Sequence, residues 1–163
     1  REGLAPGTTL EGRYRIVRKM GEGGMGAVYE GEHLMIKRRV AIKCLHANFS
    51  HEPEAVERFR REALAATAIG NPHIIEVTDM GELDDGAPFM VLELLEGKEL
   101  EDVIEGDGPM PVGRLCHILE QACSALEVAH GLGIVHRDLK PANFFLTSFR
   151  DDHDFLKILD FGI

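Results

Sequence analysis

The sequence predicts an α+β fold in which a strand-rich region with one helix precedes a mainly helical region. Five short segments within residues 1–93 have the composition of β-strands. Residues 53–69 and 111–130 repeat apolar side chains with the period of an α-helix. The first helix therefore falls among the strands, and the second, longer helix lies beyond them.

Length, charge and cysteine content exclude several classes of protein. The 163 residues are the length of one domain and suffice for a hydrophobic core. With 18 basic and 28 acidic residues the net charge is −10, so no nucleic-acid partner is expected. Three scattered cysteines (Cys44, Cys116 and Cys123) form no disulfide framework and indicate a cytoplasmic location. This piece contains no predicted membrane segment, although a longer chain could be anchored outside it.

A glycine-rich turn separates the first two predicted strands, at residues 13–20 and 27–30. The turn contains Gly21, Gly23, Gly24 and Gly26. Bare backbone can approach phosphate groups closely, and Val28 can cover a flat base. A dinucleotide-binding loop would be followed by a helix, and a Walker loop would contain Gly-Lys-Ser/Thr; neither is present. The glycines alone leave open a simple flexible hairpin turn.

A lysine and a glutamate on neighbouring elements are predicted to pair. In the third strand, at residues 40–44, alternation places Ala41 and Lys43 on one face, which they share with Val28. Glu62 falls within the apolar arc of the first helix, where an unpaired carboxylate is costly. Lys43 is the candidate partner, and a Glu62 that reaches solvent at the edge of the arc is the alternative. The arc consists of Val56, Phe59, Ala63, Ala66 and Ile69.

The remaining strands complete the first region, and a linker follows. Residues 74–77 and 89–93 are interpreted as strands. Residues 94–98 break the pattern and are interpreted as a hinge, which divides the chain into lobes at residues 1–93 and 99–163.

The second lobe is predicted to contain a short helix at residues 100–104, the long helix and a hairpin. Cys116 and Cys123 lie beside the core stripe of the long helix and are interpreted as packing residues. Two strands at residues 144–147 and 156–159 form the hairpin, whose charged tip at 150–154 is interpreted as a solvated turn. The stripe consists of Leu115, Ile118, Leu119, Ala122, Ala125, Leu126 and Ala129.

The polar segment after the long helix contains the residues suited to chemistry. Asp138, Lys140 and Asn143 lie within six residues, and the segment 160–162 reads Asp-Phe-Gly. An aspartate that accepts a hydroxyl proton, a lysine and an asparagine that holds a metal are what phosphoryl transfer to an alcohol needs. Taken alone, the cluster could be an ordinary polar loop.

In their order along the chain these motifs resemble the eukaryotic-type (Hanks-type) serine/threonine protein kinases. The resemblance runs from about residue 13 to the last residue. It implies a protein-kinase-like α+β fold, with a five-stranded antiparallel N-lobe (1–93), a hinge (94–98) and the first, mainly helical part of a C-lobe (99–163). The matching residues are Gly21-x-Gly23-x-x-Gly26-x-Val28, Ala41-Ile42-Lys43, Glu62, His136-Arg137-Asp138-Leu139-Lys140-Pro141-x-Asn143 and Asp160-Phe161-Gly162. The Gly23-Gly24-Met25-Gly26 run resembles bacterial members.

The resemblance implies transfer of phosphate from ATP, with Mg²⁺ or possible Mn²⁺, to serine or threonine hydroxyls of protein substrates. Asp138 would accept the hydroxyl proton and Lys140 would neutralise the phosphoryl group. Lys43, aimed by Glu62, would hold the α- and β-phosphates. The implied metal ligands are Asn143 and Asp160.

The resemblance also implies a nucleotide site. Val28, Ala41 and Phe145 would enclose adenine, Glu93 and Leu95 would offer backbone groups to its edge, and the residue before Glu93 would guard the rear of the pocket. The implied nucleotide-binding residues are Met20, Gly21, Gly23, Gly24, Gly26, Val28, Ala41, Lys43, Glu93, Leu95 and Phe145.

Three features depart from the family pattern. Seventeen residues separate Asn143 from Asp160, which places extra length in the charged tip. Ala66 stands where the family often has a larger apolar residue. The chain stops at Ile163, before an activation loop that Arg137 could engage, so we expect a truncated kinase that is inactive by itself.

Two alternatives share the fold. A pseudokinase-like regulatory module would bind ATP without transfer, but such modules usually lack at least one of Lys43, Asp138, Asn143 and Asp160. A small-molecule kinase is disfavoured by the glycine loop and by the Lys-Pro pair that begins at Lys140.

Overall fold

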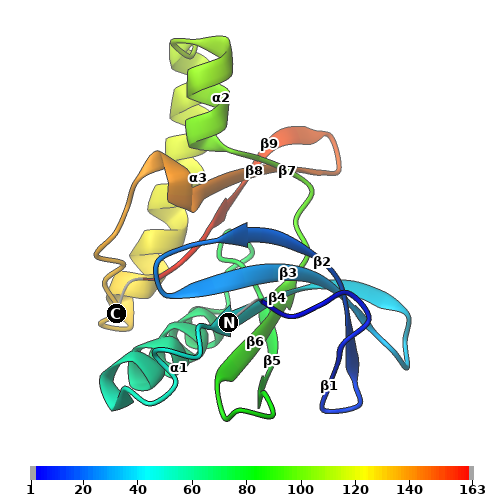
Figure 1. Ribbon diagram of the computed structural model, residues 1–163. Helices are drawn as coiled ribbons and strands as arrows, with labels where there is room; N and C mark the ends of the chain where they lie inside the picture. Colours follow the sequence, from blue (N-terminus) through cyan, green and yellow to red (C-terminus); the bar gives the residue numbers. More distant parts are fainter. Residues whose placement is uncertain (1–2, 162–163) are drawn as a thin grey trace. The chain divides into compact units, whose positions relative to one another are not determined.

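The computed structural model describes residues 3–161, which divide into two compact units (Figure 1). The sheet unit extends to Ala63 and also contains Val77–Leu94. The helical unit contains Leu64–Glu76 and the chain from Leu95 onward. The change of unit after Leu94 falls within the predicted hinge, while the division into lobes at residues 1–93 and 99–163 stays a prediction.

The sheet unit is built around a six-stranded antiparallel sheet with the order β1-β2-β3-β4-β6-β5. Its strands are β1 (Thr9–Leu10), β2 (Tyr14–Glu22), β3 (Gly26–His33), β4 (Arg38–Leu45), β5 (Val77–Glu82) and β6 (Pro88–Glu93). The predicted antiparallel sheet is therefore confirmed. The two-residue strand β1 adds a sixth member, because Thr9 and Leu10 pair with Arg15 and Tyr14.

One predicted strand is displaced along the chain. Residues 74–77 were expected to join the sheet, but β5 begins only at Val77. Ile74 instead forms an isolated parallel bridge with Ile158, and the N–H of Ile75 donates to the Ile158 carbonyl at 3.1 Å. The apolar run thus pairs with a segment more than eighty residues later, a partner that its composition does not reveal.

One face of the six-stranded sheet carries the hydrophobic core. The buried cluster includes Leu10, Tyr14, Ile16, Ala27, Tyr29, Val40, Ile42, Cys44, Phe89 and Val91. Fully burying a side chain such as Ile42 contributes about 2 kcal/mol. Val28 lies directly opposite Lys43 in the β3–β4 register, so both side chains lie on the other face, as predicted.

Helix α1 (Pro53–Ile69) has the bounds that the sequence predicts. Proline suits its first turn because no intrahelical partner awaits a backbone N–H there. Val56, predicted within the apolar arc, is only half-buried. The buried residues of the helix are Ala55, Phe59, Ala63, Ala65, Ala66 and Ile69.

The helical unit combines helices with a three-stranded sheet of order β7-β8-β9. Its elements are β7 (Gly97–Glu99), α2 (Leu100–Asp107), α3 (Val112–Gly131), the 3-10 turn η1 (Pro141–Asn143), β8 (Phe144–Phe149) and β9 (Asp152–Ile158). The predicted hairpin is confirmed as the antiparallel pair β8–β9. None of the described helices has the length and apolar character needed to cross a membrane.

The buried stripe of α3 is narrower than predicted. Leu115 and Leu119 are 37% and 44% exposed, and Cys116 and Cys123 are also exposed, so the prediction that these cysteines pack is wrong. Only one row of α3 side chains, spaced three and four residues apart, is buried in the helical unit. The residues on either side of this row remain exposed or partly exposed. The row is Ile118, Ala122, Ala125 and Ala129.

The charged tip of the hairpin is likewise not a simple solvated turn. Only Arg150 and Asp151 form the turn, and Asp152 and Asp154 lie within β9. Asp154 forms an ion pair with Arg114 of α3, and Asp152 lies within hydrogen-bond distance of His117 on the same helix. The extra length in this hairpin therefore extends a strand that is attached to the helix.

Candidate active site

Lys43 and Glu62 form an ion pair in the sheet unit, as predicted. The Lys43 Nζ lies 2.7 Å from Glu62 Oε1, and the side chains are 23% and 20% exposed. A short hydrogen bond between charged groups fixes the direction of the ammonium group. Beside the pair lies a cavity of about 90 Å³. It is lined by Met25, Gly26, Lys43, Leu45, Ala55, Arg58, Phe59 and Glu62.

The glycine turn joins β2 to β3 and has one side open. The N–H of Gly23 donates to the Gly26 carbonyl at 2.8 Å, which closes the turn. A Cβ on Gly26 would lie 2.3 Å from the Cys44 carbonyl oxygen, so only glycine permits this approach of β4. Added Cβ atoms on Gly21 and Gly24 would meet nothing within 4 Å. These two positions leave room for a ligand to approach the backbone.

His46 is a residue near this turn that the sequence interpretation missed. Its Nε2 lies 3.1 Å from the carbonyl oxygen of Gly23 and 3.6 Å from a carboxylate oxygen of Glu22. Since a carbonyl only accepts, Nε2 donates, and the ring ties the turn to the end of β4. A lone histidine after a strand gave no sequence signal for this contact.

The predicted nucleotide-binding residues are distributed over both units. In the sheet unit, Ala41 lies opposite Leu92 of β6, and Val28 lies opposite Lys43. Met20 is 43% exposed on β2. In the helical unit, Leu95 and Phe145 are half-buried, the latter on β8. The structure thus assembles Val28, Ala41 and Lys43 on one face and leaves the remaining assignments as predictions.

His136 anchors the loop that contains Asp138. It is 1% exposed, its Nε2 donates to the Leu159 carbonyl at 2.7 Å, and its Nδ1 accepts the N–H of Asp138 at 3.1 Å. These bonds require a neutral ring with its proton on Nε2. The ring also packs against Phe161, with centroids 4.6 Å apart. Both aromatic residues belong to motifs found in the sequence, but the sequence alone did not predict that they anchor this loop.

Asn143 fixes Asp138 from the other side. Asn143 is buried, and its Nδ2 donates to the carbonyl oxygen of Asp138 at 2.8 Å and to the Asp138 carboxylate at 3.2 Å. The Asn143 carbonyl accepts the N–H of Leu159 at 2.8 Å, which brings the residue before Asp160 to the same place. Lys140 Nζ lies 3.6 Å from Asp138, and both side chains are more than half exposed, so a substrate can reach them.

Asp160 and Arg137 have left-handed backbones, with φ angles of 49° and 68°. Such conformations are uncommon outside glycine and concentrate at functional sites. Glu99, a residue that the sequence analysis did not single out, lies near Asp160. Burial and neighbouring acids, Asp160 among them, raise the pKa of Glu99. Gly162, the last member of the Asp-Phe-Gly motif, lies outside the described residues.

The helical unit offers oxygen ligands suited to Mg²⁺. With Nδ2 of Asn143 directed at Asp138, its Oδ1 is left as the side-chain ligand, alongside the carboxylate of Asp160. Within residues 3–161, no group of three or more His, Cys, Asp or Glu side chains could hold a metal unaided.

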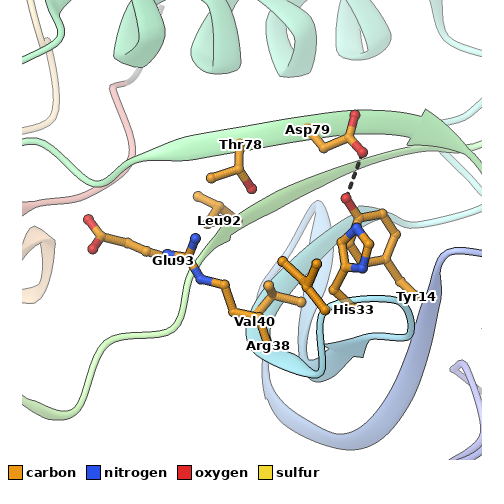
Figure 2. A pocket seen from close by; sticks show the side chains of 9 residues that line it. Tyr14, His33, Arg38, Val40, Thr78, Asp79, Leu92 and Glu93 are labelled. Carbon is orange, nitrogen blue, oxygen red and sulfur yellow. Dashed lines mark hydrogen bonds between the residues drawn. The ribbon is translucent and has the colours of Figure 1, made fainter.

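A larger cavity of about 270 Å³ lies elsewhere in the sheet unit (Figure 2). The hydroxyl of Tyr14 donates to Asp79 at 2.6 Å at its edge. Burial and this hydrogen bond raise the pKa of Tyr14 to about 12. The cavity is lined by Tyr14, His33, Ile36, Arg38, Val40, Thr78, Asp79, Leu92 and Glu93. Val28, Ala41 and Lys43 do not line this cavity, whereas Glu93, another predicted nucleotide-binding residue, does.

Comparisons with known proteins agree with these features. The protein kinase domain model matches residues 14–163. The chain is 45% identical to the serine/threonine-protein kinase Pkn1 of Myxococcus xanthus over 93% of its own length and 22% of the relative's. It is 43% identical to the serine/threonine-protein kinase PknH of Mycobacterium bovis over 95% of its length and 25% of the relative's. The chain thus spans about a quarter of these relatives.

A solved structure gives the same result for the fold. The crystal structure of the Mycobacterium tuberculosis PknI kinase domain matches with a TM-score of 0.81 and 35% identity, covering 99% of this chain and 64% of that one. The chain therefore belongs to the protein kinase domain family, within its bacterial, Hanks-type serine/threonine group.

Proposed function

We propose that this chain contributes the nucleotide-binding and catalytic residues for ATP-dependent phosphoryl transfer to serine and threonine hydroxyls of protein substrates. The observation that supports this most directly is the double attachment of Asp138, by His136 at its backbone N–H and by Asn143 at its carbonyl and carboxylate. A carboxylate held in this way, yet exposed, is suited to meet a substrate hydroxyl. Since the chain spans about a quarter of its relatives, the activity is proposed for the full-length protein.

The helical unit would perform the proton transfer and hold the metal. Asp138 would orient the hydroxyl and accept its proton, and Lys140, within 3.6 Å of Asp138, would neutralise the phosphoryl group. Asn143 and Asp160 would hold Mg²⁺, which offsets the negative charge of the phosphates when bound. The protein would contribute mainly position and charge, because the P–O bond that breaks belongs to ATP and the one that forms joins its γ-phosphorus to the substrate hydroxyl.

The sheet unit would bind the nucleotide. The open side of the glycine turn offers backbone N–H groups, and Lys43, held by Glu62, offers a fixed positive charge to the phosphates. Val28 and Ala41, on the same face as Lys43, would cover adenine. The proposed contributions of Met20, Glu93, Leu95 and Phe145 follow the family pattern.

Replacement of the proposed base tests this function. In the full-length protein, Asp138→Asn keeps the shape and loses the proton acceptor, so we expect the rate of ³²P transfer to a protein substrate to fall about 10²–10³-fold. Asp151→Asn, an isosteric change in the exposed β8–β9 turn, is the matched control and should keep the wild-type rate.

Two results would contradict the proposal. Near-normal phosphate transfer by Asp138→Asn would show that Asp138 is not the base that accepts the hydroxyl proton. A wild-type protein that binds ATP but transfers phosphate to neither itself nor any protein substrate would instead indicate a regulatory module. The expectation that residues 1–163 alone transfer phosphate poorly stays a prediction.

A further inference from the structure

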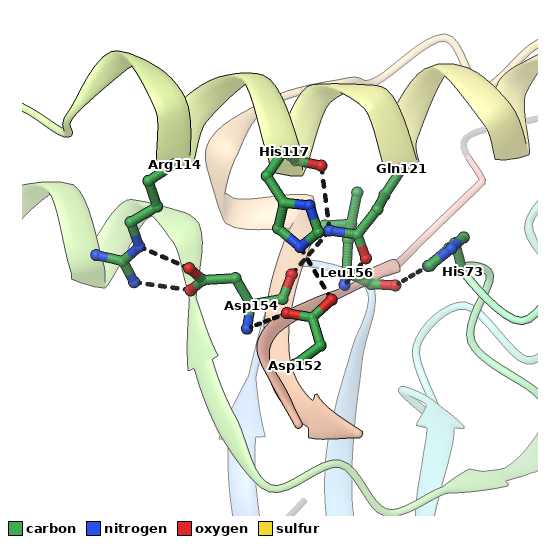
Figure 3. Close-up of polar contacts among 7 residues, drawn as sticks. All are labelled: His73, Arg114, His117, Gln121, Asp152, Asp154 and Leu156. Carbon is green, nitrogen blue, oxygen red and sulfur yellow. Dashed lines mark hydrogen bonds and ion pairs between the residues drawn. The ribbon is translucent and has the colours of Figure 1, made fainter. Parts of the chain in front are cut away.

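At Asp154 and Leu156, one edge of β9 is closed by side chains rather than by a neighbouring strand (Figure 3). Gln121 of α3 donates from Nε2 to the Asp154 carbonyl at 2.8 Å, and its Oε1 accepts the N–H of Leu156 at 3.0 Å. A single side-chain amide thus replaces the donor and the acceptor that an adjacent strand would present. The same Nε2 also contacts the His117 carbonyl at 3.2 Å, so both carbonyl contacts agree on the orientation of the amide.

The closure continues along the same edge. The Leu156 carbonyl accepts a hydrogen bond from Nδ1 of His73 at 2.9 Å. Ile158 then donates to the His73 carbonyl at 2.7 Å and accepts from Ile75 at 3.1 Å. Leu159 is held from the opposite edge, because its N–H donates to the Asn143 carbonyl just before β8, and its carbonyl accepts from His136. Hydrogen bonds on this edge therefore run from Asp154 to Ile158, and Leu159, the residue before Asp160, is held on the other side.

Two further side chains of α3 bind aspartates at the beginning of β9. Arg114 binds Asp154 with two hydrogen bonds, from Nε and Nη2, each 2.9 Å long. His117 Nε2 lies 2.9 Å from the carboxylate of Asp152. A two-point arginine–carboxylate contact fixes direction as well as distance, which a flexible lysine pair would not. Together with Gln121, these contacts hold β9 at three positions on successive turns of α3.

We propose that Gln121 and Arg114 are positioning residues for Asp160, and that α3 thereby sets the position of the metal-binding carboxylate. The inference rests on the metal-binding role proposed above for Asp160. Asp160 follows β9 after one intervening residue, so a displacement of the end of this strand would displace the backbone of Asp160 with it. Metal sites tolerate displacements of only about 0.5 Å, and loss of an outer support typically costs 10–100-fold in metal affinity or activity.

The test measures metal dependence in the full-length protein. In Gln121→Ala, we expect the free Mg²⁺ concentration that gives half the maximal transfer rate to rise on the order of 10-fold. The dissociation constant for ATP measured in EDTA should stay within twofold of wild type, because no nucleotide-binding residue is changed. Glu120→Ala, at the exposed neighbouring position of α3, is the matched control and should shift neither quantity.

A purely structural role for Gln121 predicts a different pattern. If Gln121→Ala lowers the melting temperature but leaves the Mg²⁺ dependence within twofold of wild type, the proposal is overturned. Should Gln121→Ala fail to fold, Asp154→Asn provides the same readout, since it removes the ion pair with Arg114 while keeping the side-chain shape. An unchanged Mg²⁺ dependence in that variant overturns the proposal as well.

Asp160→Asn separates this inference from the proposed function. If Asp160→Asn leaves the Mg²⁺ dependence unchanged, the metal assignment itself fails, and the positioning role falls with it. If Asp160→Asn abolishes transfer while Gln121→Ala and Asp154→Asn behave like wild type, only the positioning role is wrong.

Discussion

At the scale of single residues, the site depends on side chains whose direction is fixed by a second side chain. Glu62 aims Lys43, Asn143 holds Asp138, and in each pair one member is expected to contact substrate or nucleotide. A flexible side chain loses conformational entropy when it binds, so holding it beforehand lowers that cost. Under the proposed function, the supporting partner would contribute to the reaction without touching the reacting atoms.

Replacement of Lys43 tests the sheet unit's contribution. In Lys43→Met the chain length is kept and the charge is lost, which leaves Glu62 without its ammonium partner as well as removing a contact to phosphate. We expect the transfer rate to fall about 10²–10³-fold in steady-state assays of the full-length protein. Lys37→Met, an exposed change in the β3–β4 turn, is the control. A Lys43→Met rate within tenfold of wild type would show that this lysine does not act on the phosphates.

At the scale of elements, the β3–β4 pair requires glycine at the end of the glycine turn. In Gly26→Ala the new methyl group would lie 2.3 Å from the Cys44 carbonyl oxygen, so the strands must separate locally. Overpacking of this kind costs about 1–3 kcal/mol. We expect a lower melting temperature for Gly26→Ala. Gly24→Ala, which meets nothing within 4 Å, should melt near wild type, and equal melting of the two variants would refute the argument.

The middle of the same sheet contains a buried carboxylate. Glu30 on β3 is 4% exposed, and it accepts hydrogen bonds from Arg39 and from Nε of Arg18, the latter at 2.7 Å. The Arg39 hydrogen bond, the largest influence, together with Arg18 holds the pKa of Glu30 below its usual value despite burial. The carboxylate therefore stabilises the folded state at neutral pH.

The sign of this effect predicts a pH dependence. A carboxyl group with a depressed pKa in the folded state stabilises fully above its unfolded pKa, and the stabilisation is lost as pH falls through the folded pKa. We expect Glu30→Gln to melt well below wild type at pH 7 and the difference to shrink below about pH 4. Glu32→Gln, which disrupts a more exposed pair with Arg15, should have a small effect at either pH. A Glu30→Gln difference that stays constant with pH would exclude the electrostatic explanation.

At the scale of the whole molecule, local sequence patterns predicted most helices and strands. They did not predict most contacts between segments that lie far apart in the chain. Helix α1 has its predicted bounds, and the burial cost of Glu62 correctly identified Lys43 as its partner. Residues 74–77 were misplaced because a short apolar run does not specify which strand it will pair with. The aspartates of β9 looked like part of a solvated turn because their partners lie 35 and 40 residues away on α3. His136 shows the same difficulty within the site, since its bond to the Leu159 carbonyl joins the loop of Asp138 to a segment 23 residues later.

Binding of nucleotide and metal should stabilise the full-length protein against thermal unfolding. A ligand at 100 times its dissociation constant stabilises the state that binds it by about 2.7 kcal/mol. We therefore expect Mg²⁺ with ATP to raise the melting temperature more than ATP in EDTA does. In Asp160→Asn, the additional increment from Mg²⁺ should disappear in thermal unfolding scans. An increment of wild-type size in that variant would place the metal elsewhere.

The closed edge of β9 also affects how the protein behaves among other copies of itself. A strand with unpaired backbone groups is a template on which a strand of a second molecule can add, and such addition leads to aggregation. Side chains of Gln121 and His73 occupy those groups at Asp154 and Leu156, and the backbone of His73 and Ile75 occupies them at Ile158. The amide of Gln121 thus shields the hairpin from intermolecular strand pairing, and solubility becomes a second property that depends on it.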